Sequence, residues 1–179
     1  MFYLLNQYSK GKVAWYLLVF SVVILQAVAV YFQITLYLEP CSLCIYQRIA
    51  LIGILFSGIV GFIGSKNLFF RNVAILGWLF SAYKGFDLAY LQARLQFAPR
   101  ISDSCSLGVR YPKFLPLDEW LPIIFKATDQ PCSKKVWSFL TLEMSQWMMI
   151  IFCCYLIIGT LVMLSQMVSP PNTNTIWKN

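Results

Sequence analysis

The chain of 179 residues is 59% hydrophobic and only 12% charged. Soluble domains carry about 25% charged residues, so this composition excludes an ordinary soluble domain and predicts a single integral membrane domain over residues 1–179. The net charge of +7 is compatible with nucleic-acid binding, but the basic residues lie between long apolar runs and form no patch. We therefore expect no nucleic-acid partner.

Four apolar segments predict an all-α protein built as a bundle of four transmembrane helices, since a span needs about 20 apolar residues. The third segment is interrupted by Lys84 and Asp87, which lie near one of its ends. They can pair on one helix face or reach the membrane surface. The expected spans cover residues 13–34, 44–64, 72–91 and 144–167.

Small residues occur inside two of these spans. Gly53, Ser57 and Gly61 recur every four residues in the second span. Small side chains at this spacing let membrane helices approach closely, although the ordinary glycine content of a membrane helix explains the pattern equally well. Cys153 and Cys154 lie in the middle of the fourth span, where we expect them to be buried as small hydrophobic residues.

The only long polar segment, residues 92–143, lies between the third and fourth spans and contains Cys105 and Cys132. About fifty residues are too few for a robust core of their own. We expect a largely irregular loop at the membrane surface, with a short amphipathic turn within residues 117–125.

The distribution of charge predicts the orientation of the chain. The two ends and the short turn between the second and third spans carry basic residues and no acidic ones, and such segments stay in the cytoplasm. Residues 39–44 and 92–143 then share the outer compartment, where disulfides persist. The basic residues are Lys10, Lys12, Lys66, Arg71 and Lys178.

The pair Cys41 and Cys44 forms a Cys-x-x-Cys motif that permits several interpretations. A zinc site needs four ligands, and this chain has no histidine and no second motif of the same spacing, so we expect no metal. A structural disulfide is the stronger alternative, but so short a loop removes little unfolded-state entropy. Strained or exposed bridges are the labile ones used in redox chemistry, which we favour here.

The surroundings of this pair point the same way. A helix that begins just after Pro40 has both sulfurs at its N-terminus, where the dipole and the free N–H groups favour thiolate. Arg48 follows Cys44 by one helical turn, so it lies on the same face and its charge further stabilises a Cys44 thiolate.

Cys105 and Cys132 enclose a loop of about 28 residues, whose closure by a disulfide would stabilise the chain by roughly 3–4 kcal/mol. The loop has little core to stabilise, so we favour an exchangeable bridge over a structural one. Two exchangeable pairs on one face would form a relay for two electrons. The electron donor would be a soluble dithiol protein, and the electron acceptor that fits the membrane boundary is a lipid-soluble quinone.

The sequence closely resembles the DsbB family over nearly its whole length. Members of this family are bacterial inner-membrane proteins that reoxidise the periplasmic thiol oxidase DsbA and reduce a quinone. The matching segments are residues 5–7, 40–48, 109–110, 115–118 and 142–147, together with Cys105 and Cys132.

The resemblance implies a role for each site residue. Cys105 would form the mixed disulfide with a DsbA-like partner, with Cys132 as its original bridge partner. Cys132 would then exchange with Cys41, releasing Cys44 as a thiolate that contacts the quinone ring or adds to it transiently. Arg48 would hold a quinone carbonyl. The resemblance further implies a four-helix bundle in the inner membrane, redox cysteines on the periplasmic side, and ubiquinone or menaquinone as acceptor.

One departure from the family concerns the outer end of the third span. Some members carry an acidic residue and a histidine there, whereas this chain has Leu91 and Gln92. A histidine role in proton transfer or quinone binding is therefore absent or filled otherwise. Two alternatives stay open: a DsbI-like relative that serves a dedicated dithiol partner, and a non-enzymatic membrane protein with structural disulfides.

Overall fold

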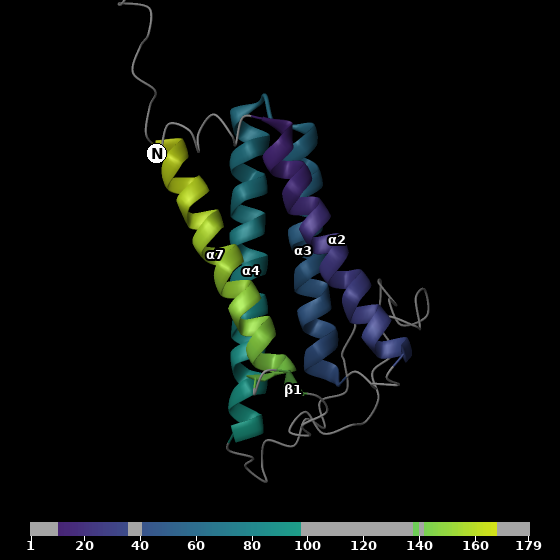
Figure 1. Ribbon diagram of the computed structural model, residues 1–179. Helices are drawn as coiled ribbons and strands as arrows, with labels where there is room; N and C mark the ends of the chain where they lie inside the picture. Colours follow the sequence, from purple (N-terminus) through teal and green to yellow (C-terminus); the bar gives the residue numbers. More distant parts are fainter. Residues whose placement is uncertain (1–10, 36–40, 98–137, 140–141, 168–179) are drawn as a thin grey trace, which may run out of the picture.

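A computed structural model describes residues 11–35, 41–97, 138–139 and 142–167. Within these residues the chain forms a bundle of four long helices, and Figure 1 shows α7 beside α4, α4 beside α3, and α2 crossing in front of α3. This confirms the expected all-α, four-helix architecture. A short antiparallel hairpin of β1 (Ser138–Phe139) and β2 (Leu142–Glu143) leads into the last helix. The helices are α2 (Lys12–Thr35), α3 (Ser42–Ile63), α4 (Leu68–Phe97) and α7 (Met144–Met167).

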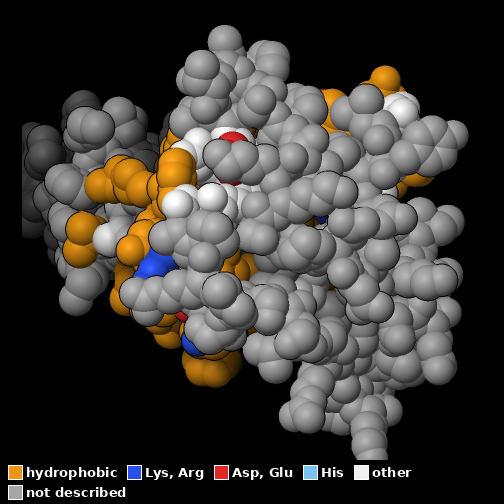
Figure 2. Space-filling model, turned by 90° about the horizontal axis from the view of Figure 1, so that it is seen from below, with side chains coloured by type: hydrophobic (Ala, Val, Ile, Leu, Met, Phe, Trp, Pro, Cys, Tyr) orange, Lys and Arg blue, Asp and Glu red, His pale blue; other side chains and the backbone are white. Residues whose placement is uncertain are grey.

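The outer surface of the bundle is strongly apolar. Every helix directs large hydrophobic side chains outward, and Phe20, Phe56, Phe80 and Ile157 are examples from the four helices in turn. In the end-on view of Figure 2, hydrophobic groups make up most of the coloured surface and charged groups are few. Soluble monomers rarely expose apolar patches larger than a few hundred Å², so this surface suits a lipid environment.

Three of the described helices, α2, α3 and α7, are long and apolar enough to cross a membrane. The remaining helix, α4, is less apolar because charged residues interrupt it. Two of these, Lys84 and Asp87, are exposed on the outside of the bundle. The packing of α4 between α3 and α7 nevertheless gives it a central place in the bundle.

Close contact between α3 and α4 depends on small residues from both helices. A Cβ atom on Gly53 would lie 2.5 Å from Ser81 Oγ, and a Cβ atom on Gly77 would lie 2.7 Å from Ser57 Oγ. Each pair therefore places a glycine of one helix against a serine of the other. Of the three small residues noted in the sequence, Gly53 and Ser57 thus face α4 and Gly61 meets Trp15 of α2, which favours the close-approach alternative.

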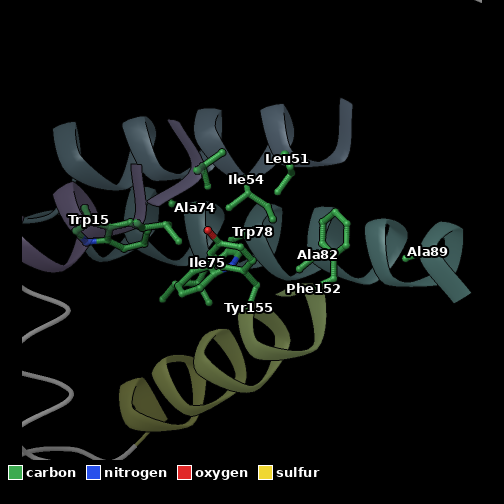
Figure 3. Packing of buried hydrophobic residues seen from close by; sticks show 12 residues of the cluster. Trp15, Leu51, Ile54, Ala74, Ile75, Trp78, Ala82, Ala89, Phe152 and Tyr155 are labelled. Atoms are coloured by element: carbon green, nitrogen blue, oxygen red, sulfur yellow. The ribbon is translucent and has the colours of Figure 1, made fainter. Parts of the chain in front are cut away.

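Aromatic side chains fill the centre of the bundle, as Figure 3 shows. The rings of Trp78 and Tyr155 meet edge to face, with centroids 6.5 Å apart. The Tyr155 hydroxyl is hydrogen-bonded to Ser21 Oγ at 2.8 Å, which joins α7 to α2. Phe152 is fully buried against Gly85, where a side chain on the glycine would collide with the ring. Side chains from α2, α4 and α7 thus contact one another in the centre of the bundle.

The helix α4 extends beyond the expected third span at both ends. The sequence placed the start of the loop at residue 92, but residues 92–97 continue the helix. Ala93 and Leu95 are buried, so packing against the bundle stabilises the extra turns. The first helix-breaking residue after them in the sequence is Pro99. The apolar run therefore ends several residues before the helix does.

Candidate redox site

The Cys-x-x-Cys pair lies at the start of α3. The helix begins at Ser42, and Cys41 is its N-cap residue in an extended conformation, with φ −75° and ψ 166°. The Ile45 N–H donates a hydrogen bond to the Cys41 carbonyl at 3.2 Å. Cys44 therefore lies in the first turn. The prediction that both sulfurs are at a helix N-terminus is confirmed, and the helix dipole there favours negative charge.

The two sulfur atoms are close together. The Sγ atoms of Cys41 and Cys44 are 3.1 Å apart, and either thiol could donate a hydrogen bond to the other. Cys41 is only 7% exposed and packs with Leu43 and Leu95, whereas Cys44 is half-buried. Cys44 is thus the more accessible sulfur in this state, although the sequence interpretation placed Cys41 toward the incoming exchange.

Arg48 is buried one turn beyond Cys44, with 6% of its surface exposed. Its guanidinium lies close enough to Cys44 for a thiolate there and the positive charge to attract each other. The Nη1 group donates to Gln33 Oε1 at 2.7 Å, and the Arg48 carbonyl accepts a hydrogen bond from Gln26 Nε2 at 3.0 Å. Two glutamines of α2 therefore hold the arginine.

Sequence reasoning did not identify these two glutamines as part of the site. The signal that could have found them is their spacing, since Gln26 and Gln33 are seven residues apart and share one face of an otherwise uncharged span. Polar residues inside a membrane helix usually face the bundle interior, where they find partners.

A third glutamine reaches the sulfurs from α4. Gln92 Nε2 lies 3.4 Å from Cys44 Sγ and 3.8 Å from Cys41 Sγ. Its Oε1 atom accepts a hydrogen bond from Gln47 Nε2 at 2.8 Å. The sequence had indicated Gln92 only as a departure from the family, and the structure places it against both thiols.

The remaining cysteines divide into two groups. Cys105 and Cys132 lie outside the described residues, so their expected roles stay predictions. Cys153 is half-buried and Cys154 is exposed on α7, so the prediction that both are buried in the bundle is wrong for Cys154. The thiol is small and weakly polar, so a lipid-facing position is compatible with its chemistry.

Two adjacent thiols lie beside a helix N-terminus, a buried arginine and amide donors. These three kinds of group stabilise negative charge on sulfur. The family model described as "Disulfide bond formation protein DsbB" matches residues 11–162. The chain belongs to the DsbB family. The DsbB match includes α2, α3, α4 and most of α7, and it therefore contains the whole site described above.

Individual DsbB relatives are similar over almost their full length. A disulfide bond formation protein B of Pectobacterium atrosepticum is 46% identical over 162 residues, which cover 90% of this chain and 91% of the relative. One from Yersinia enterocolitica is 44% identical over 170 residues, or 95% and 96% of the two chains. One from Salmonella typhimurium is 43% identical over 166 residues, or 93% of each.

Proposed function

We propose that this chain oxidises a soluble, periplasmic, DsbA-like dithiol protein and passes the two electrons to a membrane quinone. Its membership of the DsbB family supports a function in disulfide bond formation. The observation that carries the finer proposal is the placement of two thiols with Sγ atoms 3.1 Å apart beside the buried charge of Arg48. A dithiol that can form a bridge thus lies beside a positive group that would stabilise the negative charge an acceptor gains on reduction.

The first half of the proposed reaction is disulfide exchange. A thiolate of the reduced partner attacks Cys105 of the Cys105–Cys132 bridge, and Cys132 leaves as a thiolate. Cys132 then attacks Cys41, which breaks the Cys41–Cys44 bridge and releases Cys44 as a thiolate. The second thiol of the partner resolves the mixed disulfide, so the partner leaves oxidised and Cys105 is freed.

The second half returns the chain to its starting state. Cys105 attacks Cys132, which reforms their bridge and releases Cys41. The reduced pair of Cys41 and Cys44 then gives two electrons to the quinone and forms its own bridge again. The two protons lost by the partner's thiols are balanced by the two that the quinol gains.

The residues at the site fit a quinone. Ubiquinone and menaquinone both present ring carbonyls that gain negative charge on reduction, and an arginine is a strong donor to such oxygens. Arg48 would hold a carbonyl and stabilise this charge. Cys44, one turn away, would be the sulfur that faces the ring. When bound, the quinone supplies the two-electron acceptor that the side chains lack.

The charge distribution of the bundle supports a periplasmic site in the bacterial inner membrane. Lys12 at the start of α2, Lys66 in the turn and Arg71 at the start of α4 lie at one end. The pair at the start of α3 lies at the opposite end. Short basic segments stay in the cytoplasm, so the sulfurs would face the periplasm.

The proposal is tested with the purified full chain in lipid nanodiscs, a reduced thioredoxin-fold dithiol oxidase and a short-chain ubiquinone or menaquinone. We expect quinone-dependent oxidation of the partner. Cys44→Ser should stop quinone reduction while the partner is still trapped on Cys105. Normal quinone reduction by Cys44→Ser would contradict the proposal.

A second measurement separates this function from a purely structural role. Structural disulfides have reduction potentials below about −300 mV, whereas a bridge that oxidises another strong oxidant must have a much higher potential. A Cys41–Cys44 potential below that value, with no quinone dependence, would instead indicate a structural bridge. Comparing several purified dithiol partners would identify a DsbI-like protein with one dedicated partner.

A further inference from the structure

Two buried glutamines meet beside the sulfur pair. Gln47 on α3 is 3% exposed and Gln92 on α4 is 6% exposed. A buried amide is unfavourable unless its donors and acceptor are hydrogen-bonded. Both residues therefore need polar partners at the α3–α4 interface, and the geometry shows which ones they have.

The contact between the two amides orients Gln92. Its Oε1 atom accepts from Gln47 Nε2 at 2.8 Å, so its Nε2 group is directed to the sulfurs. The distances from Nε2 are 3.4 Å to Cys44 Sγ and 3.8 Å to Cys41 Sγ. A primary amide has two N–H donors, which allows one group to contact both sulfur atoms.

We propose that Gln92 is a further catalytic residue, which donates a hydrogen bond to the Cys44 thiolate, and that Gln47 is the positioning residue that holds it. This inference rests on the proposed function only in treating Cys41 and Cys44 as the redox pair. Hydrogen bonds to an ionised group are about twice as strong as those between neutral groups, so the contact favours the thiolate over the thiol.

The amide is suited to a sulfur that changes its protonation state. With a thiolate, the Nε2 group of Gln92 donates to Cys44; with a thiol, the Cys44 S–H donates to Gln92 Oε1 at 3.8 Å. An amide does not titrate in the range in which proteins function, so its support for the thiolate does not depend on pH. Gln92 neither takes nor gives a proton in this role.

The test measures the thiolate of Cys44 directly. In a Cys41→Ser background, Cys44 is alkylated with iodoacetamide over a range of pH, and modification is quantified by mass spectrometry of the peptide that contains it. We expect Gln92→Leu to raise the midpoint of this profile by about one pH unit, a roughly tenfold loss of reactivity below the midpoint. Gln47→Leu should shift the midpoint in the same direction by a smaller amount.

Two further variants make the result specific. Gln92→Met has a similar volume and removes both amide donors, so it should raise the midpoint about as much as Gln92→Leu. It also serves if the leucine variant fails to fold. Gln96→Leu, one turn further along α4, removes an amide that accepts a hydrogen bond from Ser145 instead, and should leave the midpoint unchanged.

A midpoint that is the same in folded Gln92→Met as in the Cys41→Ser parent would overturn the inference. The alkylation profile needs neither quinone nor partner protein. A shifted midpoint in a chain that reduces no quinone would therefore overturn only the proposed function. An unshifted midpoint in a chain that turns over quinone would overturn only the role of Gln92.

Discussion

Arg48 on α3 donates a hydrogen bond to the side chain of Gln33 on α2 at 2.7 Å. Gln33 is neutral, so this bond fixes the direction of the guanidinium without neutralising its charge. The fixed charge lies one helical turn from Cys44. A buried cation that keeps its charge attracts an anion strongly, because the surrounding medium screens it less than water does.

Replacing Arg48 with alanine should weaken quinone binding. Hydrogen bonds to charged groups contribute about 1.5–3 kcal/mol, so we expect the KM for quinone to rise by at least about tenfold and turnover to slow. Arg48→Lys keeps the charge but loses the planar group. We expect its KM for quinone to lie between those of the unsubstituted chain and Arg48→Ala. The measurement is the quinone dependence of partner oxidation. Unchanged KM in Arg48→Ala would remove this residue from the site, and trapping of the partner on Cys105 should be normal in both variants.

Gln33→Leu tests the orientation of the arginine separately from its charge. We expect a rise of several-fold in the KM for quinone, smaller than that of Arg48→Ala, because the guanidinium is still present but less well fixed. Thr35→Val is a matched control near the same end of α2, where the hydroxyl group bonds only the carbonyl of Tyr31 in its own helix among the contacts described. Equal effects of the two substitutions would argue against a specific role for Gln33.

Gly85→Ala should destabilise the bundle. The added methyl group would collide with the buried ring of Phe152, and overpacking of this kind costs about 1–3 kcal/mol. This exceeds the gain in helix propensity of up to about 1 kcal/mol. The midpoint of thermal unfolding in detergent should fall. Combining Gly85→Ala with Phe152→Leu should recover part of the loss, and failure to do so would show that the collision is not the cause.

The hydrogen bond between Ser21 and Tyr155 offers a measure of coupling between α2 and α7, since their hydroxyl oxygens are 2.8 Å apart. Tyr155→Phe removes the hydroxyl group and keeps the ring against Trp78. A double-mutant cycle with Ser21→Ala should give a coupling free energy of about 0.6 kcal/mol, the average for such bonds in membrane bundles. Strictly additive effects of the two substitutions would contradict the bond.

Local patterns were sufficient to predict much of this molecule. The apolar runs indicated the helices, and the spacing of Cys41, Cys44 and Arg48 placed them on one face at a helix start. These features depend on neighbours within a turn or two. The contribution of Gln33 and Gln92 could not be predicted in the same way, because it depends on how α2 and α4 are aligned against α3.

Two wrong expectations have a related cause. The third helix was expected to end at Leu91, but Leu95 is buried in contact with Cys41, and this contact stabilises the added turns. Cys154 was expected to be buried, but it is exposed on α7. Hydrophobicity alone does not distinguish a residue that faces lipid from one that faces another helix, because both environments are apolar.

The contact of Gly53 with Ser81 has a consequence for the chemistry at the helix end. Gly53 is nine residues from Cys44, about 13 Å along the axis of α3. The distance between α3 and α4 at this point sets how far the Gln92 amide can reach toward sulfur. Residues in the middle of these helices would thereby act as a spacer for chemistry at the end of α3. We therefore expect a substitution at Gly53 that widens the α3–α4 spacing to change the redox potential of the Cys41–Cys44 pair from a distance.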